Sequence, residues 1–195
     1  MLTPMSTHER LIALLAERSV LFGEFTLASG RRSDFYIDAR LSTMSPEGLR
    51  LIGEAGCAAI ESWNVDSVGG LTMGADPIAY AIAYASAATA KPLRAFSVRK
   101  EAKAHGTGKR VEGPFLRGDV VAVVEDVITS GSSALSAIEA VEQAGGTVAG
   151  VLALLDREEG GRDKIESRGH RVIALTQGPA VLAAARSRPG GQSTV

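Results

Sequence analysis

Residues 120–133 read Val-Val-Ala-Val-Val-Glu-Asp-Val-Ile-Thr-Ser-Gly-Ser-Ser. The continuous Val/Ala run at 120–124 predicts a strand covered on both faces, as in a parallel sheet. Glu125 and Asp126 are then expected where this strand ends. That edge of an open α/β sheet is where such folds bind their ligands.

Small residues follow the two acids and lead into a predicted helix. Hydroxyl groups and free backbone N–H groups at a helix N-terminus favour an anion, so this segment predicts a phosphate site. A sugar phosphate would suit the whole run, because the carboxylates could accept hydrogen bonds from ribose hydroxyls. For any single residue, an ordinary N-cap or a solvated turn is the simpler interpretation. The residues concerned are Val127, Ile128, Thr129, Ser130, Gly131, Ser132 and Ser133.

Composition limits the possible functions. The chain has 195 residues, a net charge of −1 and one cysteine, Cys57. The near-neutral charge gives no general attraction to nucleic acid or anionic membranes, and one cysteine excludes an internal disulfide. No apolar run reaches membrane-spanning length, and the N-terminus lacks a basic segment followed by an apolar one. We therefore expect a cytoplasmic enzyme or binding protein.

The pattern along the chain predicts an α/β fold. Ser6 and Glu9 have capping-box spacing and open a helix to about Arg18. Short strands are expected at 24–27 and 35–40, and a helix from Pro46 to near Trp63. Strands at 67–70, 93–98, 120–124, 147–155 and 172–175 then alternate with helices at 76–88 and 132–144, which implies a mostly parallel twisted sheet flanked by helices. We expect one domain over 1–187 and a flexible tail at 188–195.

The gap between the strands ending near Val98 and beginning near Val120 is too long for a passive connection. Five of the 21 Lys and Arg residues fall within the 12 positions 99–110. A basic, glycine-containing loop could be a lid over a polyanion. It could equally be a solvated mobile loop, and charge alone does not decide between the two. Its candidate residues are Arg99, Lys100, Lys103 and His105.

Two interpretations are possible for a glycine-containing turn at 69–76. Its glycines would let backbone N–H groups approach a phosphate closely. It could also be a plain strand-to-helix turn with Asp76 as N-cap and Pro77 at the first helical position.

Three segments, in order, resemble the orotate phosphoribosyltransferase family. The 120–133 run resembles the signature with which phosphoribosyltransferases bind 5-phosphoribosyl 1-pyrophosphate (PRPP). The sequence Arg99-Lys100-x-x-Lys103-x-His105-Gly106 resembles the mobile catalytic loop, or flap, of the orotate enzymes. Residues 25–40 resemble their small N-terminal hood, and the resemblance extends from about Phe22 to Arg157.

The resemblance implies transfer of the 5-phosphoribosyl group from PRPP to orotate, giving orotidine 5′-phosphate and pyrophosphate in pyrimidine biosynthesis. It implies a hood at about 1–40 and a flap at about 99–115. Catalytic roles fall to Arg99, Lys100, Lys103, His105 and Asp126. The same four flap residues, Glu125, Asp126 and residues 127–133 would bind PRPP, and Thr129, Arg157, Phe35 and Tyr36 would bind orotate.

The resemblance also implies Mg²⁺ held mainly through PRPP and water, with no direct protein ligand. It implies a homodimer in which the flap reaches the partner's site. Two positions depart from the family pattern, because some members carry Lys where this chain has Ala28 and Met73. The alternatives are a phosphoribosyltransferase for another base, such as a purine, and a non-catalytic regulator that senses PRPP or a nucleotide.

Overall fold

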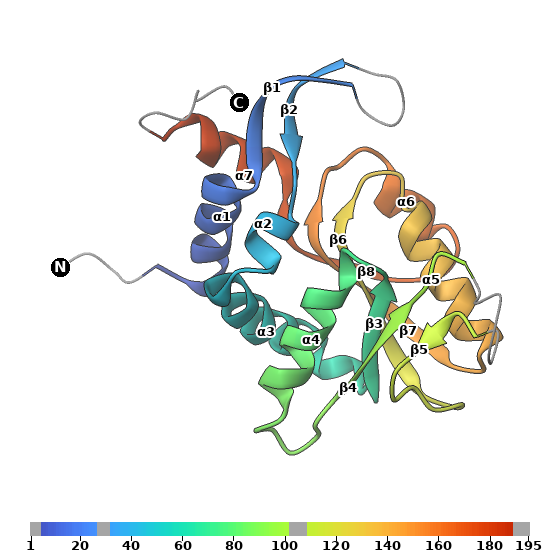
Figure 1. Cartoon of the computed structure of the whole chain (residues 1–195). Coiled ribbons are helices and arrows are strands. Elements are labelled where there is room, and N and C mark those ends of the chain that lie inside the picture. The colour runs from blue at the N-terminus through green and yellow to red at the C-terminus, as the bar shows by residue number, and fades with distance from the viewer. Residues whose placement is uncertain (1–4, 27–31, 102–108, 189–195) are drawn as a thin grey trace.

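The computed structural model describes residues 5–26, 32–101 and 109–188, which form two sheets surrounded by helices (Figure 1). The main sheet has six strands, and all its neighbouring pairs are parallel except β5 with β4. This confirms the predicted α/β class with a mostly parallel sheet. The strand order is β5 (Val111–Glu112), β4 (Arg94–Val98), β3 (Ser67–Leu71), β6 (Val120–Ile128), β7 (Thr147–Asp156) and β8 (Val172–Gln177).

The central strand β6 is longer than the sequence predicted. The expectation that it ends at Val124, with Glu125 and Asp126 beyond it, is wrong. Its pairing with β7 continues to Ile128, which lies opposite Asp156. Val127 and Ile128 are β-branched residues that suit a pleated strand, so they extend it past the two acids.

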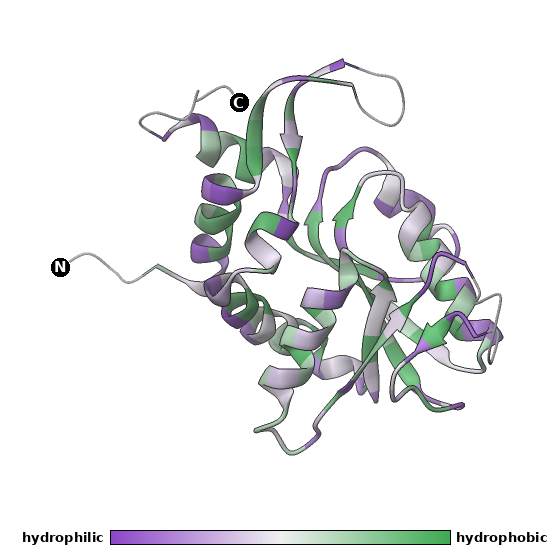
Figure 2. Cartoon of the chain, in the orientation of Figure 1, coloured by the Kyte–Doolittle hydropathy of each residue, from purple (hydrophilic) through white to green (hydrophobic). Residues whose placement is uncertain are grey.

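Alternate residues of β6 face two separate cores. Val121 and Val123 belong to one hydrophobic cluster, whereas Ala122 and Val124 belong to the other. All four side chains are fully buried, as expected for a strand covered on both faces. Figure 2 shows hydrophobic residues in strands of the main sheet and helices in which hydrophobic and hydrophilic residues are mixed.

Helices cover both faces of the sheet. One core contains residues from α1 (Thr7–Arg18), α3 (Pro46–Ile60), α4 (Ala75–Ser86) and α7 (Gly178–Arg186). The other contains residues from α5 (Ser132–Gln143) and α6 (Gly161–Glu166). A short 3₁₀ helix, η1 (Glu61–Trp63), follows α3. The sequence analysis did not predict α6, α7, β5 or the four-residue helix α2 (Arg40–Thr43).

The small second sheet is the predicted hood. It pairs β1 (Val20–Thr26) with β2 (Arg32–Ile37) in antiparallel register. Strand β2 lies earlier than the predicted 35–40 strand, and Arg40 begins α2 instead. The hood stands over the end of the main sheet, beside α1 and α7 (Figure 1).

Helix α1 packs within the molecule. Its capping box between Ser6 and Glu9 is present, and Leu11 and Leu15 are buried. His8 Nδ1 lies 3.0 Å from the carbonyl oxygen of Leu175 in β8. The helix therefore ties the start of the described chain to the edge of the sheet.

The tail predicted at 188–195 lies outside the described residues except for Arg188. Within the three described ranges, no helix has both the length and the apolar character needed to cross a bilayer.

Candidate active site

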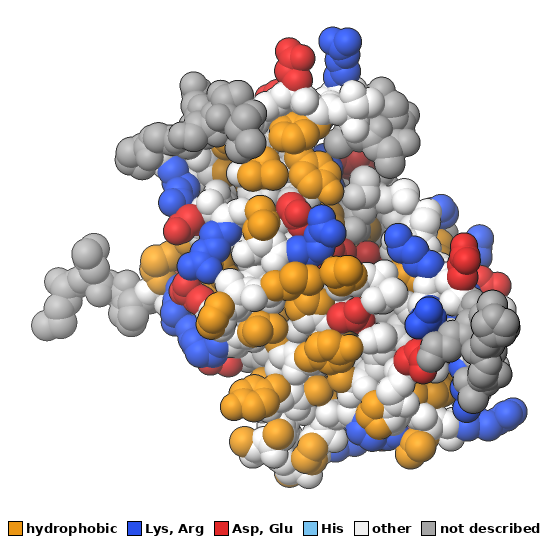
Figure 3. All heavy atoms as spheres, viewed as in Figure 1, with side chains coloured by type: hydrophobic (Ala, Val, Ile, Leu, Met, Phe, Trp, Pro, Cys, Tyr) orange, Lys and Arg blue, Asp and Glu red, His pale blue; other side chains and the backbone are white. Residues whose placement is uncertain are grey.

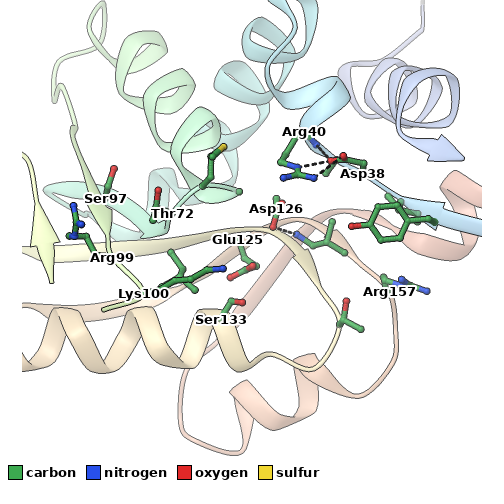
Figure 4. Close-up of a pocket in the computed structure, with 18 of the residues that line it drawn as sticks. Asp38, Arg40, Thr72, Ser97, Arg99, Lys100, Glu125, Asp126, Ser133 and Arg157 are labelled. Atoms are coloured by element: carbon green, nitrogen blue, oxygen red, sulfur yellow. Dashed lines mark hydrogen bonds and ion pairs between the residues drawn. The ribbon is translucent and has the colours of Figure 1, made fainter. Parts of the chain in front are cut away.

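A cavity of about 1450 Å³ lies between the hood and the carboxyl ends of β3, β4, β6 and β7 (Figure 4). A second cavity of about 100 Å³ adjoins it beneath the loop that enters α5. Parallel strands bring their carboxyl ends to the same sheet edge, which explains why residues distant in sequence meet here. Of the predicted site residues, the large cavity brings together Tyr36, Arg99, Lys100, Glu125, Asp126, Val127, Thr129, Ser133 and Arg157.

Glu125 is the most deeply buried acid of this site. Its Oε2 atom is buried and has no hydrogen-bond partner among the described residues. Burial, and then the neighbouring charge of Asp126, raise the pKa of Glu125 to about 9. At neutral pH Glu125 is therefore protonated and can donate a hydrogen bond, whereas the sequence analysis treated it only as an acceptor.

Asp126 faces the turn that connects β3 to α4. Its Oδ1 accepts a hydrogen bond of 2.8 Å from the backbone N–H of Val127. A Cβ atom added to Gly74 would lie 2.3 Å from Asp126 Oδ2, so a larger residue at this position would require the Asp126 carboxylate to shift. The peptide bond between Thr72 and Met73 in this turn is cis.

The reading of Asp76 as the N-cap of α4 is wrong. Gly74 is the N-cap and has no side-chain cap, and Asp76 lies inside the first turn. There its Oδ2 accepts a hydrogen bond of 2.6 Å from the Thr72 hydroxyl. The acid thus fixes Thr72, which lines the large cavity, instead of capping the helix.

The small cavity lies at the segment for which the sequence predicts a phosphate site. Residues 127–133 and Glu125 line it, and Gly131 is the N-cap of α5 with φ of 72°. This left-handed backbone favours glycine and turns the loop into the helix N-terminus. Ser130, Ser132 and Ser133 therefore all line one small cavity at the N-terminus of α5.

Arg157 lies between the hood and β7. Its guanidinium is 5.4 Å from the centre of the Phe35 ring and pairs with Glu159 at 2.8 Å. The side chain is only 10% exposed, so Arg157 is not an ordinary surface arginine. Tyr36, one residue further along β2, lines the cavity, whereas the Phe35 ring packs against the Arg157 guanidinium.

The two ends of the predicted flap are joined at the sheet edge. The N–H of Arg99 donates to the Arg110 carbonyl at 2.8 Å, and Arg110 donates to Ser136 Oγ of α5 at 2.9 Å. Arg99 and Lys100 line the cavity at the end of β4 (Figure 4). Lys103 and His105 lie outside the described residues, as does Ala28 of the hood.

The sequence analysis missed two charged residues of the cavity wall, Asp38 and Arg40. Arg40 donates to the Asp38 carboxylate from Nε at 2.8 Å and from Nη2 at 2.9 Å. A signal was available, because an Asp-x-Arg sequence follows the Phe35-Tyr36 pair after a single residue, Ile37.

Comparisons with known proteins show the family to which this chain belongs. The orotate phosphoribosyltransferase of Aquifex aeolicus is 47% identical over 174 residues, which are 88% of this chain and 95% of that protein. The chain belongs to the orotate phosphoribosyltransferase family. The family enzyme of Streptomyces avermitilis is 46% identical over 80% of this chain and 86% of its own length. No family model matches the chain.

Solved structures of the family share the fold over most of the chain. The Mycobacterium tuberculosis enzyme in complex with Fe(III) dicitrate has a TM-score of 0.82 at 40% identity, covering 90% of this chain and 99% of that one. The same enzyme in complex with PRPP has a TM-score of 0.77 at 36% identity, covering 90% and 99%. An adenine phosphoribosyltransferase from Leishmania tarentolae, at 18% identity and a TM-score of 0.67, shares the fold alone.

Proposed function

We propose that this chain transfers the 5-phosphoribosyl group of PRPP to orotate at the cavity under the hood. The products are orotidine 5′-phosphate and pyrophosphate, a step of pyrimidine nucleotide biosynthesis. One observation carries this proposal: the acids of β6, the nest before α5 and the Arg157 guanidinium all adjoin one cavity. Family membership supports the same reaction.

The ribose 5-phosphate end of PRPP occupies the β6–α5 loop. Backbone N–H groups from Thr129 to Ser133 and the α5 dipole bind the 5-phosphate, because both favour an anion. Asp126 accepts a hydrogen bond from one ribose hydroxyl, and protonated Glu125 donates to another. The unpartnered Oε2 of Glu125 supports this assignment.

The chemical step breaks the bond between the anomeric carbon and the pyrophosphate oxygen. The leaving group gains negative charge while the ribose ring becomes cationic, so catalysis requires charge stabilisation and exclusion of water. Asp126 stabilises the cationic ring. Arg99 and Lys100 bind the pyrophosphate from the end of β4, and Lys103 and His105 of the flap close over it.

Orotate binds between the hood and the end of β7. The planar Arg157 guanidinium matches a carboxylate in a bidentate manner, and its position over Phe35 and beside Glu159 holds that plane fixed. The Thr129 hydroxyl binds the ring and Tyr36 lies beside it. An orotate site at this place fits the burial of Arg157, since a buried guanidinium needs such partners.

Mg²⁺ fits this donor set through its substrate. The ion keeps several waters and takes its remaining ligands from carboxylates and substrate phosphates. Among the residues described by the structure, no three His, Cys, Asp or Glu side chains are grouped to hold a metal. When bound, Mg²⁺ would neutralise pyrophosphate charge, and Asp126 is the acid nearest to the proposed ribose hydroxyls.

The enzyme acts as a homodimer in which each flap reaches the partner's site. A hydrophobic face beside the cavity supports this proposal (Figure 3). It lies over α2, α3 and α4, where Figure 3 shows hydrophobic side chains gathered. A second copy of this chain is the partner that a self-complementary apolar face fits. The face comprises Leu41, Met44, Leu49, Tyr80 and Tyr84, all exposed.

We further propose one domain over residues 1–187, with the hood at about 1–40 and the flap at about 99–115. The enzyme acts in the cytoplasm, where its charged small-molecule substrates would be available.

An ultraviolet assay tests the function. Orotate absorbance is followed with PRPP and Mg²⁺, with purine bases and a reaction without Mg²⁺ as controls. Mg²⁺-dependent consumption of orotate alone is the expected result. Consumption of a purine instead, or binding of PRPP without turnover of any base, would overturn the proposal in favour of another transferase or a regulator.

A second experiment tests the flap. Lys103→Ala should lower kcat more than it raises either KM, because its contact strengthens as the leaving group gains charge. Normal turnover in this variant would remove Lys103 from the mechanism.

A further inference from the structure

Arg40 is held rigidly at the rim of the cavity by Asp38. Besides the bonds from Nε and Nη2, the backbone N–H of Arg40 donates to Asp38 Oδ1 at 3.1 Å. This bidentate pair fixes the plane of the guanidinium. The Nη1 atom and one Nη2 hydrogen have no partner among the described residues and remain available to a ligand.

The guanidinium lies beside Asp126 and the turn that carries Thr72, Met73 and Gly74. All of them line the same cavity, and Figure 4 shows Arg40 close to Asp126. Asp126 in turn touches Gly74, as the 2.3 Å approach of an added Cβ shows. The Asp38 hydrogen bonds contribute most to the raised pKa of Arg40, and the Asp126 charge contributes as well.

This wall of the cavity is otherwise unsuited to an anion. Asp38 and Asp126 bring negative charge to it, and Met73 brings an apolar side chain that is 59% exposed. The other described cations of the cavity lie elsewhere: Arg99 and Lys100 follow β4, and Arg157 follows β7. Among the described residues that line the cavity, Arg40 is thus the cation on the wall that carries Met73 and Gly74.

We propose that Arg40 is a pyrophosphate-binding residue of this enzyme and that Asp38 is the residue that positions it. The inference rests on the proposed function, since it assigns a further contact to the same PRPP site. Orotate is the less suitable ligand for Arg40, because Arg157 already presents a fixed guanidinium at the base end of the cavity. Restraint by Asp38 lowers the entropic cost of holding the long arginine side chain against the ligand.

The test compares Arg40→Gln, Arg40→Lys and Asp38→Asn with the intact chain. Binding of inorganic pyrophosphate with Mg²⁺, and of orotate, is measured by calorimetry, together with both KM values. We expect Arg40→Gln to weaken pyrophosphate binding and raise the KM for PRPP by about ten- to one-hundredfold, as for a lost hydrogen bond to a charged group. Orotate binding should change less than about threefold, and Arg40→Lys should retain part of the pyrophosphate affinity.

Two further variants distinguish a specific effect on pyrophosphate binding from a general effect of the substitution. Arg50→Gln is the matched control, because Arg50 forms a comparable exposed ion pair with Glu54 at 2.8 Å but does not line the cavity. Met73→Lys places a cation on the same wall, so it should restore pyrophosphate affinity in the Arg40→Gln background. A thermal unfolding midpoint within about 2 °C of the intact chain confirms that the variants are folded, as expected for an exposed side chain.

Unchanged pyrophosphate and PRPP binding in Arg40→Gln would overturn the inference. A selective loss of orotate binding would also overturn it and assign Arg40 to the base. If Arg40→Gln fails to fold, Arg40→Lys and Asp38→Asn decide by the same binding measurement. Failure of the intact chain to consume orotate would contradict the proposed function itself, which keeps the two failures distinct.

Discussion

At the scale of single residues, Glu125 shows how burial turns an acid into a hydrogen-bond donor. Its pKa rises from 4.5 to about 9. Between these pH values the folded chain keeps a proton that the unfolded chain has lost. Raising the pH therefore lowers the free energy of unfolding, the opposite of the behaviour of a salt-bridged acid.

The variant Glu125→Gln tests this protonation. Its free energy of unfolding should exceed that of the intact chain by an amount that grows from pH 5 to pH 9, by up to about 1.4 kcal/mol per pH unit. Urea unfolding at several pH values provides the measurement. Glu142→Gln on the exposed surface of α5 serves as the control and should show no such trend. A constant difference for Glu125→Gln would mean that Glu125 is ionised in the folded chain.

Arg157 is the residue whose burial most directly indicates a ligand. Arg157→Ala should raise the KM for orotate by about one-hundredfold with a smaller effect on PRPP, because a charged bidentate partner is lost. Steady-state kinetics with each substrate varied separately measure the difference. Arg168→Ala, at an exposed arginine just after α6, should leave both constants unchanged. An equal rise in both KM values would instead indicate a general disturbance of the cavity.

At the scale of elements, the shape of the proposed phosphate nest depends on α6, a helix that does not line the small cavity. A Cβ atom added to Gly161 would lie 2.4 Å from the Thr129 carbonyl oxygen and 2.7 Å from the Gly131 nitrogen. Since these are backbone atoms, the loop itself must shift to accommodate the methyl group. The start of α6 thus sets the shape of the loop before α5.

Gly161→Ala should therefore raise the KM for PRPP by about tenfold or more while the KM for orotate changes little. The neighbouring Gly160 has nothing within 4 Å of an added Cβ and a φ of 86°, so Gly160→Asn is the matched control. Separate titrations of the two substrates distinguish the outcomes. A PRPP site that tolerates Gly161→Ala would show that α6 does not constrain the nest.

At the scale of the whole molecule, the hydrophobic face over α2 to α4 predicts a dimer. Tyr84 is 86% exposed, and Tyr84→Glu would place a charge on that face. Sedimentation should show a dimer for the intact chain and a weaker one for Tyr84→Glu, because an unpaired charge in an apolar interface is costly. A monomeric intact chain would contradict this prediction.

A mixing experiment tests whether the flap acts on the partner's site. Asp126→Asn disables the β6 acid and Lys103→Ala the flap, so each homodimer should be nearly inactive. Random mixing gives heterodimers with one intact site, and activity should recover to about one quarter of the intact enzyme. No recovery, with exchange of subunits verified, would place the flap in the site of its own chain.

The sequence by itself determined the fold class, the order of the central elements and the family. The Val/Ala run of β6, the small residues before α5 and the hydrophobic periodicity of α1 are local signals, because each reflects the 2.0- or 3.6-residue repeat of a single element. The segment at 127–133 could be singled out for the same reason, since the residues that line the small cavity are nearly all consecutive. The end of β6 was not predicted, because the acidic pair Glu125-Asp126 looks locally like the end of a strand. Pairing with β7, together with the β-branched side chains of Val127 and Ile128, continues the strand to Ile128.

Only the tertiary structure decided how residues far apart in sequence act together. The raised pKa of Glu125 arises from burial between two layers, which no local pattern encodes. Arg157 is covered by Phe35 of the hood, more than one hundred residues earlier in the chain. The Asp38–Arg40 pair is close in sequence, but its place beside Asp126 and Gly74 follows from packing of the hood against the sheet. Long-range packing sets the local dielectric constant around a charged side chain, its distance from other charges and its orientation. These quantities determine what the charged side chain can do.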